Sequence, residues 1–507
     1  MALALVAGCG ELPSPAADRP SSRALDASTT ATTRIGSAVA PLVAAHPGLS
    51  GIHALPTGHS AFAARALLAA AAERSLDVQY YIWHDDVSGG LLVEALRLAA
   101  ARGVRVRLLL DDNNTAGMDP LLAALDANPN VELRLYNPFV QRQFRPLGYV
   151  TEFSRLNRRM HNKSFTADNQ ATIVGGRNVG DEYFAAGEEV GFADLDVLAV
   201  GPVVNEVSKS FDLYWSSASA YPAASVIAKS AGDGHAELAR RAQALQKEPR
   251  AHSYLDSVAQ SPIMRDLASG QLALDWARTT VHYDDPAKTL ARRAELEQTL
   301  MLPRLAKTVG EARSGFDVVS PYFVPTRSGA EGFAELARRG VKVRVLTNSL
   351  AATDVSAVHA GYAKWRPTLL DAGVQLFELQ RSAGIGDKDQ RLLLTGSSAA
   401  SLHAKTFAVD GERIFIGSFN LDPRSAALNT ELGFVIESPR LANALGEAFL
   451  QAIPKAAYEV RRAPGGGLEW IDRSSGTDKL LTTEPDSGLL QRALVRVMSW
   501  LPIEWML

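Results

Sequence analysis

The hydrophobic pattern of this chain predicts the same order of elements twice. In each half, a strand-like hydrophobic run leads into a helical stretch with apolar residues every three or four positions. The helix stops at a glycine and a second strand follows. Strand–helix–strand order implies parallel strands joined by right-handed crossovers, and therefore an α/β fold. The predicted strands are 76–82 and 104–110 in the first half and 316–320 and 341–346 in the second, with helix stops at Gly103 and Gly340.

The repeat continues downstream, where each half has a short hairpin and a further strand. We therefore expect a first lobe at 41–217 and a second lobe at 300–455. Residues 218–299 are polar and rich in Lys, Arg, Glu and Ala, which predicts a helical connection between the lobes. Residues 456–507 form a C-terminal extension. Its last segment, 489–507, is either an interfacial amphipathic helix or a helix docked on the protein.

One motif occurs in each half with the same residue types at the same spacing. A Lys follows a His by two positions, an Asp follows five positions later, and a Gly-Gly or Gly-Ser pair begins seven residues after the Asp. A strand with alternating polar residues produces a single His-x-Lys by chance, whereas two copies that match over eighteen residues indicate a shared chemical role. The first copy contains His161, Lys163, Asp168, Gly175, Gly176 and Asn178, and the second contains His403, Lys405, Asp410, Gly417, Ser418 and Asn420.

These residue types suit phosphodiester exchange. A neutral imidazole can attack phosphorus to form a phosphohistidine, while a facing imidazolium protonates the leaving oxygen and later activates the acceptor. Lys163 and Lys405 would place positive charge beside the phosphoryl oxygens. Hydrogen bonds to the phosphate would come from Asn178, Ser418 and Asn420. The small glycines would let the backbone approach the phosphate closely.

The motif leaves the role of its two acids open and speaks against a metal. Asp168 and Asp410 are either members of the catalytic set or structural residues that cap the hairpin or pair with a nearby backbone group. We expect no metal and no other cofactor, because the Lys two residues after each His would place a positive charge beside any cation bound there.

The duplicated motif resembles that of the phospholipase D superfamily. The resemblance implies two pseudo-repeated phospholipase D-like α/β sandwich lobes with the active site at their interface. It further implies that His161 is the nucleophile and His403 the general acid and base. In the superfamily, the carboxylates that orient the two His rings lie one strand beyond each motif, which matches Asp194 and Glu431 here.

Composition narrows the substrate class. The chain has 507 residues, is 47% hydrophobic and 21% charged, and carries a net charge of −3 with a pI of about 6.4. No global positive field therefore attracts nucleic acid, which disfavours a nuclease, and we expect no nucleic-acid partner. Between Arg142 and Lys163, six basic residues accompany one acid, Glu152, with aromatic residues interleaved. This segment either rests on an anionic interface or is a solvated loop whose aromatic residues fold back into the core.

The only cysteine, Cys9, lies in the sequence Leu5-Val-Ala-Gly-Cys9, which resembles a bacterial lipobox. Residues 10–40 are rich in Pro, Ser, Ala and Thr, so residues 1–40 are predicted to be a lipobox-like start and a flexible tether. We expect a membrane-associated protein of the bacterial cell envelope, anchored by lipid at Cys9. In the alternative interpretation, Cys9 is an ordinary residue near a frayed terminus. No run of apolar residues is long enough to predict a transmembrane helix.

Several segments resemble one branch of the superfamily, the bacterial cardiolipin synthases of the third type. These segments are 157–163, 348–362 and 501–504. The resemblance implies transfer of a phosphatidyl group to phosphatidylglycerol from a second phospholipid, either phosphatidylglycerol or phosphatidylethanolamine. Alternatives are a phospholipase D that hydrolyses phospholipids, a nuclease, and a lipid-binding lipoprotein without activity. Asp354, His359 and Tyr362 follow a predicted strand end and are candidates for contact with the lipid headgroup.

Overall fold

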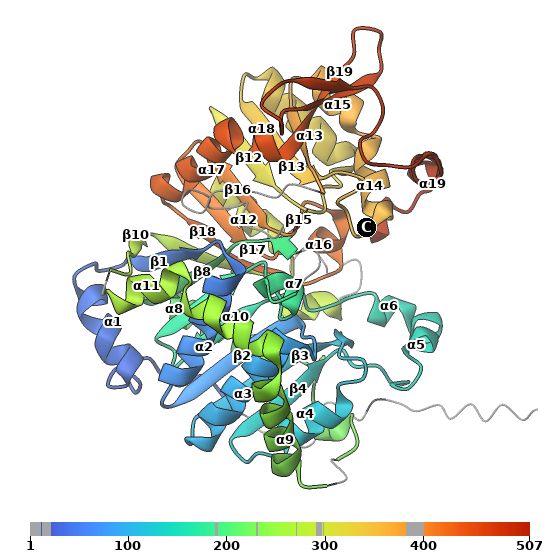
Figure 1. Ribbon diagram of the computed structural model, residues 1–507. Coiled ribbons are helices and arrows are strands. Elements are labelled where there is room, and N and C mark those ends of the chain that lie inside the picture. Colours follow the sequence, from blue (N-terminus) through green and yellow to red (C-terminus); the bar gives the residue numbers. More distant parts are fainter. Residues whose placement is uncertain are drawn as a thin grey trace, which may run out of the picture.

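Two large mixed β-sheets, one in each half of the chain, form the framework of the protein (Figure 1). The structure is a computed structural model, and it describes residues 12, 22–187, 191–229, 232–269, 271–290, 297, 299–381 and 400–507. The first sheet has the strand order β10-β1-β8-β6-β5-β2-β3-β4-β9, and the second has the order β11-β18-β17-β16-β12-β13-β14-β19-β20-β21. Two lobes of mixed α/β structure confirm the predicted fold class.

The strands of the first sheet are β1 (Ser50–Leu55), β2 (Ser75–Ile82), β3 (Arg105–Asn114), β4 (Val131–Tyr136), β5 (Ser164–Ala167), β6 (Ala171–Gly175), β8 (Asp196–Val200), β9 (Ala220–Pro222) and β10 (Asp275–Ala277). Those of the second are β11 (Thr279–Tyr283), β12 (Gly315–Val319), β13 (Lys342–Asn348), β14 (Gln375–Leu379), β16 (Lys405–Val409), β17 (Arg413–Gly417), β18 (Leu432–Ile436), β19 (Ala457–Arg462), β20 (Leu468–Asp472) and β21 (Lys479–Leu481). A small separate sheet pairs β7 (Gly191–Ala193) with β15 (Ala400–Leu402).

The helices of the first half and the connection are α1 (Arg34–Ala44), α2 (Gly58–Ala71), α3 (Val87–Ala101), α4 (Asp119–Asp126), α5 (Arg145–Thr151), α6 (Phe153–Leu156), α7 (Asp181–Phe184), α8 (Pro202–Trp215), α9 (Gly234–Lys247), α10 (Pro249–Ala259) and α11 (Pro262–Ala268). Those of the second half are α12 (Leu302–Val309), α13 (Thr326–Arg338), α14 (Ser356–Ala363), α15 (Arg366–Asp371), α16 (Pro423–Ala427), α17 (Pro439–Gln451), α18 (Ile453–Ala456) and α19 (Leu489–Trp500). In the part of the chain that the structure describes, no helix is long and apolar enough to cross a membrane.

The predicted crossover motif is present in both halves. β2 and β3 are parallel with Ser75 opposite Arg105, and β12 and β13 are parallel with Gly315 opposite Lys342. The strands that carry the motif, β5 and β16, instead run antiparallel to β2 and β12. Each sheet is therefore mixed, because a crossover helix joins parallel strands while a tight hairpin joins antiparallel ones.

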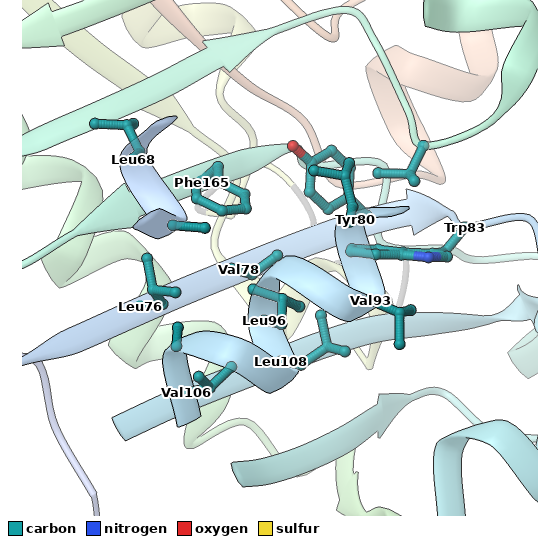
Figure 2. Packing of buried hydrophobic residues seen from close by; sticks show 14 of the residues in the cluster. Leu68, Leu76, Val78, Tyr80, Trp83, Val93, Leu96, Val106, Leu108 and Phe165 are labelled. Atoms are coloured by element: carbon teal, nitrogen blue, oxygen red, sulfur yellow. The ribbon is translucent and has the colours of Figure 1, made fainter. Parts of the chain in front are cut away.

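Alternation along β2 builds the core of the first lobe. Leu76, Val78 and Tyr80 are fully buried on one face, where they pack with residues of α2, α3, β3 and β5 (Figure 2). On the opposite face, Asp77 is ion-paired with the buried Arg107. The spacing of two residues between inward side chains is the period of a strand. The run 76–82 therefore supplies apolar side chains to one face of the sheet and polar ones to the other.

A hydrophobic cluster joins the two lobes. Val174 of β6 and Val197 of β8 belong to the same buried cluster as Ile414 and Ile416 of β17 and Phe434 of β18. Burial of this shared surface fixes the position of the first sheet against the second. The ends of β5 and β16 are thereby brought to one place, which is the interface predicted to hold the active site.

Three predicted boundaries differ from the structure. Residues 22–33 lie against the first lobe and α1 begins at Arg34, so the tether is shorter than 1–40. The connection contains the predicted helices, but β10 and β11 within it join the first and the second sheet. The second sheet continues through β19, β20 and β21 to Leu481, because β19 pairs with β14 at the open edge of the repeat.

Candidate active site

The two motif histidines are held by hydrogen bonds of their backbones across the interface between the lobes. His161 lies just before β5, and its N–H donates to the carbonyl of Thr430 at 2.9 Å. His403 lies just before β16, and its N–H donates to the carbonyl of Ala193 at 2.8 Å. His161 therefore lies against the segment before β18 of the second lobe, and His403 lies against the segment before β8 of the first lobe.

The orienting carboxylates are exchanged between the lobes. Nδ1 of His161 lies 2.8 Å from Oε2 of Glu431, and Nδ1 of His403 lies 2.6 Å from Oδ2 of Asp194. Glu431 and Asp194 are the acids that the sequence indicated, but each holds the ring from the opposite lobe. A hydrogen bond at Nδ1 leaves Nε2 as the free ring nitrogen on both histidines, so both rings face the site with the atom that does the chemistry.

Burial and nearby cations lower the pKa of both histidines. The pKa of His161 lies well below the usual value because the ring is buried and because Lys163, Lys405 and His403 repel a positive charge on it. Burial and Lys405 also lower the pKa of His403, but the Asp194 carboxylate acts in the opposite direction through charge and a hydrogen bond. The two rings therefore differ, and His161 is the one that is more strongly held in the neutral form.

The two orienting acids differ in the same sense. Burial raises the pKa of Glu431 to about 7, against the opposing effects of Lys163 and a hydrogen bond from Ser418. Burial acts on Asp194 too, but His403, Lys405 and Arg177 outweigh it, and the pKa of Asp194 is lowered. Asp194 is thus fully ionised beside His403, whereas Glu431 is only partly ionised near neutral pH.

Lys163 and Lys405 are buried cations at the centre of the site. Each ammonium group donates a hydrogen bond to the backbone carbonyl of the His two residues earlier. Burial lowers the pKa of Lys163 well below the usual value and that of Lys405 to about 8. A buried ammonium group with a depressed pKa is stabilised in its charged form when an anion binds beside it, so this pair has the chemistry to hold an anion such as a phosphate group.

The polar residues at the ends of the motifs have different surroundings. Asn178 is fully buried, its carbonyl oxygen accepts a hydrogen bond from the backbone of Ile82, and its Nδ2 has no partner among the described residues. Asn420 is also buried, and the oxygen of its side chain is unpaired within the same described part of the chain. The Ser418 hydroxyl donates to Glu431, so its one donor supports the orienting acid here, and its hydrogen bond to a phosphate stays a prediction.

Two roles, catalytic or structural, were left open for the motif acids, and their contacts match the structural one. The Asp168 carboxylate accepts hydrogen bonds from the backbone N–H groups of residues 73–75, and Asp410 does the same for residues 313–315. Both have positive φ, 52° and 57°, in the turn of the hairpin. The four-residue strand β5 separates Asp168 from the catalytic end by roughly 13 Å at 3.3 Å per residue. These acids pin the start of β2 and β12.

The motif glycines make room for the neighbouring strand, while their role in close approach to a phosphate stays a prediction. A Cβ on Gly176 would lie 2.1 Å from a carboxylate oxygen of Asp194, and one on Gly175 would lie 2.1 Å from a carboxylate oxygen of Asp196. A Cβ on Gly417 would lie 2.5 Å from the Cα of Gly433. The small residues are thus required for the close approach of the strands that deliver the orienting acids.

Two tyrosines that sequence reasoning missed flank the histidines. The Tyr81 ring packs edge-on against His161 with 5.0 Å between centroids, and Tyr183 packs edge-on against His403 at 5.1 Å. Tyr81 lies in the strand-like run 76–82, where the alternation pointed to a site-facing side chain, but Tyr183 has no such signal.

Of the three candidates for contact with the lipid headgroup, two are buried and hydrogen-bonded to acids of the second lobe or the C-terminal extension. His359 lies 2.5 Å from Glu484, and Tyr362 donates to Glu378, with both side chains buried. Asp354 accepts a hydrogen bond from Tyr322. Its negative charge acts to raise the pKa of Lys405, so Asp354 lies near the site.

One group among the described residues has the spacing of a possible cation site. It consists of His84, Asp86 and Glu182, whose ligand atoms all lie within 4.8 Å of one another. Neither motif His belongs to it, and Asp86 caps the N-terminus of α3 by accepting a hydrogen bond from Gly89.

Comparisons with known proteins agree with this geometry. The family model described as "Cardiolipin synthase, PLD-like domain" matches residues 66–215 and 305–453. The chain is 49% identical over 481 residues to cardiolipin synthase C of Escherichia coli, covering 94% of this chain and 100% of that protein. It is 24% identical to a cardiolipin synthase of Staphylococcus aureus over 80% of this chain and 67% of that protein. Among solved structures, a phosphatidylserine synthase from Haemophilus influenzae has the same fold, with a TM-score of 0.55, 15% identity, and coverage of 90% of this chain and 97% of that one.

Proposed function

Because the chain belongs to the cardiolipin synthase family with phospholipase D-like domains, we propose that it is a phosphatidyltransferase that makes cardiolipin from phosphatidylglycerol and a second phospholipid. The observation that carries this proposal is the pair of histidines, each held by a carboxylate of the opposite lobe, with two buried lysines beside them. This is the set of groups that a two-step exchange at a phosphodiester needs.

In the first step His161 is the nucleophile. Its Nε2 attacks the phosphorus of the donor lipid, the bond from phosphorus to the headgroup oxygen breaks, and His403 gives its proton to that oxygen. The products are a phosphatidyl group on His161 and the free headgroup alcohol, glycerol or ethanolamine. The assignment follows the resemblance to the superfamily, and it is supported by Asp194, whose charge and hydrogen bond act to raise the pKa of His403 against the effect of burial.

In the second step the phosphatidyl group moves to a lipid acceptor. His403, now neutral, takes the proton of a glycerol hydroxyl of phosphatidylglycerol, and the oxygen attacks the phosphohistidine. The bond between nitrogen and phosphorus breaks, which restores His161 and releases cardiolipin. Negative charge on the phosphoryl oxygens is balanced in both steps by Lys163 and Lys405, with Asn178 as a hydrogen-bond donor.

Hydrolysis is the alternative outcome of the same intermediate, when water takes the place of the lipid hydroxyl. Incubation with labelled phosphatidylglycerol, alone and with phosphatidylethanolamine, separates the two. We expect cardiolipin together with glycerol, and in the mixture also ethanolamine if that lipid is a donor. Phosphatidic acid as the only labelled product would establish a hydrolase and overturn the proposal.

Variants check that the reaction comes from the proposed site. His161→Ala and His403→Ala should each remove nearly all turnover, and the double variant should lose no more than either single one, because both residues serve one displacement. His235→Ala is the matched control, since His235 is an exposed residue of α9. A chelator should leave the rate unchanged, and restoration of a lost rate by one divalent ion would contradict the metal-free mechanism.

We also propose that the protein is held at the bacterial envelope membrane by lipid on Cys9. This residue lies outside the described part of the chain, and the support is its lipobox-like surroundings. An anchored enzyme meets both lipids in the plane of the membrane, where acceptor hydroxyls are plentiful and transfer competes well with hydrolysis.

A further inference from the structure

Two short segments carry an unusual share of the exposed apolar side chains. Of the 21 large hydrophobic residues that are exposed in the described part of the chain, eleven lie between 144 and 153 or between 489 and 505. All four exposed Phe and Trp residues of that set belong to these segments. We call them the apolar rim, which consists of Phe144, Leu147, Val150, Phe153, Leu489, Leu490, Leu494, Val497, Trp500, Leu501 and Trp505.

The first segment of the rim is connected to His161. Tyr149 of α5 donates a hydrogen bond to the side chain of Asn113, whose amide donates to the Tyr81 hydroxyl. The Tyr81 ring in turn packs against His161. Leu147 and Val150 on the same helix, and Phe144 just before it, are between 45% and 80% exposed. The helix is thus fixed beside the site by its polar residue while its apolar residues point to solvent.

The second segment has the equivalent relation to His403. α19 packs on α14 through Val495, which contacts Leu350 and Ala360 in a small buried cluster. Leu350 follows Asn348, and the Asn348 side chain holds the backbone of Leu402 next to His403. The outer face of α19 remains uncovered, with Leu490 84% and Trp500 77% exposed.

Arg424 holds the two segments on one side of the molecule. Its guanidinium donates to the carbonyl of Met506, behind α19, and to the side chain of Asn157, at the end of α6. Its backbone N–H donates to the carbonyl of Leu507. In Figure 1, α5, α6 and α19 all lie on the right-hand side, above and below the junction of the lobes.

The charge on these segments differs from that of the whole chain. Between 489 and 505 there are two arginines, Arg492 and the exposed Arg496, and one acid, Glu504, which is paired with Lys364. Between 141 and 154 the exposed residues carry no charge, and the one acid, Glu152, is paired with Arg155. The whole chain has a net charge of −3, whereas the apolar rim has arginines at its edge. An anionic surface is the complement of such a patch.

We infer that the apolar rim is a docking surface for an anionic phospholipid bilayer and that it delivers lipid from the membrane to the histidine pair. Apolar side chains, Trp at the boundary and Arg at the edge are the features of an interfacial segment. The inference rests on the proposed function, because a two-chain lipid substrate resides in a bilayer. It assigns 489–507 to the interfacial interpretation and adds the exposed part of 144–153 to it.

The test uses the full chain with Cys9→Ser in every sample, so that no acyl chain contributes. One variant combines Leu490→Ser and Trp500→Ser, and a second combines Leu147→Ser and Val150→Ser. Vesicles of phosphatidylglycerol and of phosphatidylcholine are sedimented with each protein. We expect each variant to bind phosphatidylglycerol vesicles about tenfold more weakly, and the unaltered rim to prefer phosphatidylglycerol to phosphatidylcholine.

A matched control removes exposed leucines elsewhere. Leu98→Ser with Leu450→Ser changes side chains that are 45% and 63% exposed on α3 and α17, and this variant should bind vesicles as the parent does. Quenching of Trp fluorescence by brominated lipid gives a second readout. It should fall in a variant that combines Trp500→Phe and Trp505→Leu. Unchanged quenching would overturn the inference.

Activity separates a failure of the inference from a failure of the proposed function. On a monomeric short-chain phosphatidylglycerol the rim variants should keep activity within about twofold of the parent, while on vesicles they lose it in proportion to binding. If the parent makes no transfer product from the short-chain lipid, the proposed function fails independently of the rim. If the rim variants bind vesicles as the parent does, and instead lose self-association in gel filtration, the rim contacts a second copy of the chain and the membrane assignment is wrong.

Discussion

At the scale of single residues, the two halves of the site are similar in sequence but different in electrostatics. Glu431 has its pKa raised to about 7 by burial, while the pKa of Asp194 is lowered by His403 and two further cations. A histidine beside a full carboxylate charge holds a proton more readily than one beside an acid that is partly neutral. This difference allows a near-symmetric pair to divide into a nucleophile and an acid.

The first prediction follows from this division. Glu431→Gln and Asp194→Asn should each lower kcat on natural lipid by roughly 10²–10⁴, as expected for the loss of an acid that orients a catalytic His. With a lipid whose headgroup is p-nitrophenol, which departs without a proton, Asp194→Asn should still release one equivalent in a burst. Glu431→Gln should show no burst, because its defect lies in the nucleophile. Rapid-quench kinetics checks this, and a burst seen only in Glu431→Gln would reverse the roles of the histidines.

The second prediction concerns Lys405. Burial lowers its pKa to about 8, against the opposing charges of Asp194, Glu431 and Asp354, and it must be protonated to balance the phosphoryl charge. Above pH 8 the free enzyme loses this proton, so kcat/KM should fall about tenfold per pH unit. Lys405→Arg keeps its charge throughout this range and should be slower but lack the fall. If the fall near pH 8 persists in that variant, another group is responsible.

The sequence indicates the candidate site residues better than their contacts. Duplication of the motif indicated His161 and His403, and the resemblance to the superfamily indicated the two orienting acids. It gave no means to pair each acid with a ring, because the pairing depends on how β6 and β8 pack against β17 and β18. The protein partners of Ser418 and Gly176 could not be predicted for the same reason, since they come from strands whose distance is set by tertiary packing.

At the scale of elements, the hairpins that carry the motifs are fixed at the end remote from the chemistry. Asp168 has no exposed surface and accepts three backbone hydrogen bonds from the chain before β2. Asp410 makes the equivalent bonds before β12 but is partly exposed, so water can replace it. Loss of either carboxylate loosens the strand that ends at a catalytic His.

The third prediction separates this structural role from catalysis. Asp168→Ala should destabilise the fold by roughly 2–4 kcal/mol, because the buried N–H of Ser75 and the partly buried N–H groups of Glu73 and Arg74 lose their acceptor. Asp410→Ala should cost only about 1 kcal/mol, since solvent reaches these groups. Asp168→Asn is the control, because Asn keeps an acceptor oxygen and tolerates positive φ. Thermal unfolding and activity below the transition provide the measurements. An Asp168→Ala protein with the unfolding temperature of wild type and no activity would instead make Asp168 catalytic.

Elements of the repeat were predicted with their approximate bounds. Outside it, the predicted helices of the connection are present, but the strands β10, β11, β20 and β21 were not predicted. The run 76–82 corresponds to β2 at Ser75–Ile82, and the strand at 341–346 corresponds to β13 at Lys342–Asn348. β19 has a counterpart in β9, which pairs with β4 just beyond the predicted end of the first lobe at 217. β20 and β21 have no counterpart in the first sheet, so internal comparison could not reveal that they extend the second one. The pairing of β19 with β14 is decided by an open sheet edge, which is a property of the folded lobe.

At the scale of the whole molecule, the lobes form one catalytic unit, because each supplies the acid that the other requires. The N-terminal segment is part of this unit as well. The Ser22 hydroxyl donates to Glu132, and the backbone of Ala24 donates to Asp212. A lipid on Cys9 would therefore be separated from Ser22 by only twelve residues, 10–21, a reach of at most roughly 45 Å over thirteen Cα–Cα steps. The anchor and the apolar rim can then engage the same bilayer.

The fourth prediction is that these two attachments act together. Each alone is of limited strength, since a short interfacial patch binds reversibly and the strength of a lipid anchor depends on how many acyl chains it carries. Four full-length proteins are compared by fractionation of the cells that express them: wild type, Cys9→Ser, the rim variant with Leu490→Ser and Trp500→Ser, and the combination. Wild type should sediment with the membranes, each single change should release part of the protein in high salt, and the combination should be released almost completely. Mass analysis of wild type should find acyl chains on Cys9. If Cys9→Ser remains as firmly bound as wild type and no acylation is found, Cys9 is not an anchor. If the combined variant also remains bound, neither the anchor nor the rim holds the protein at the membrane.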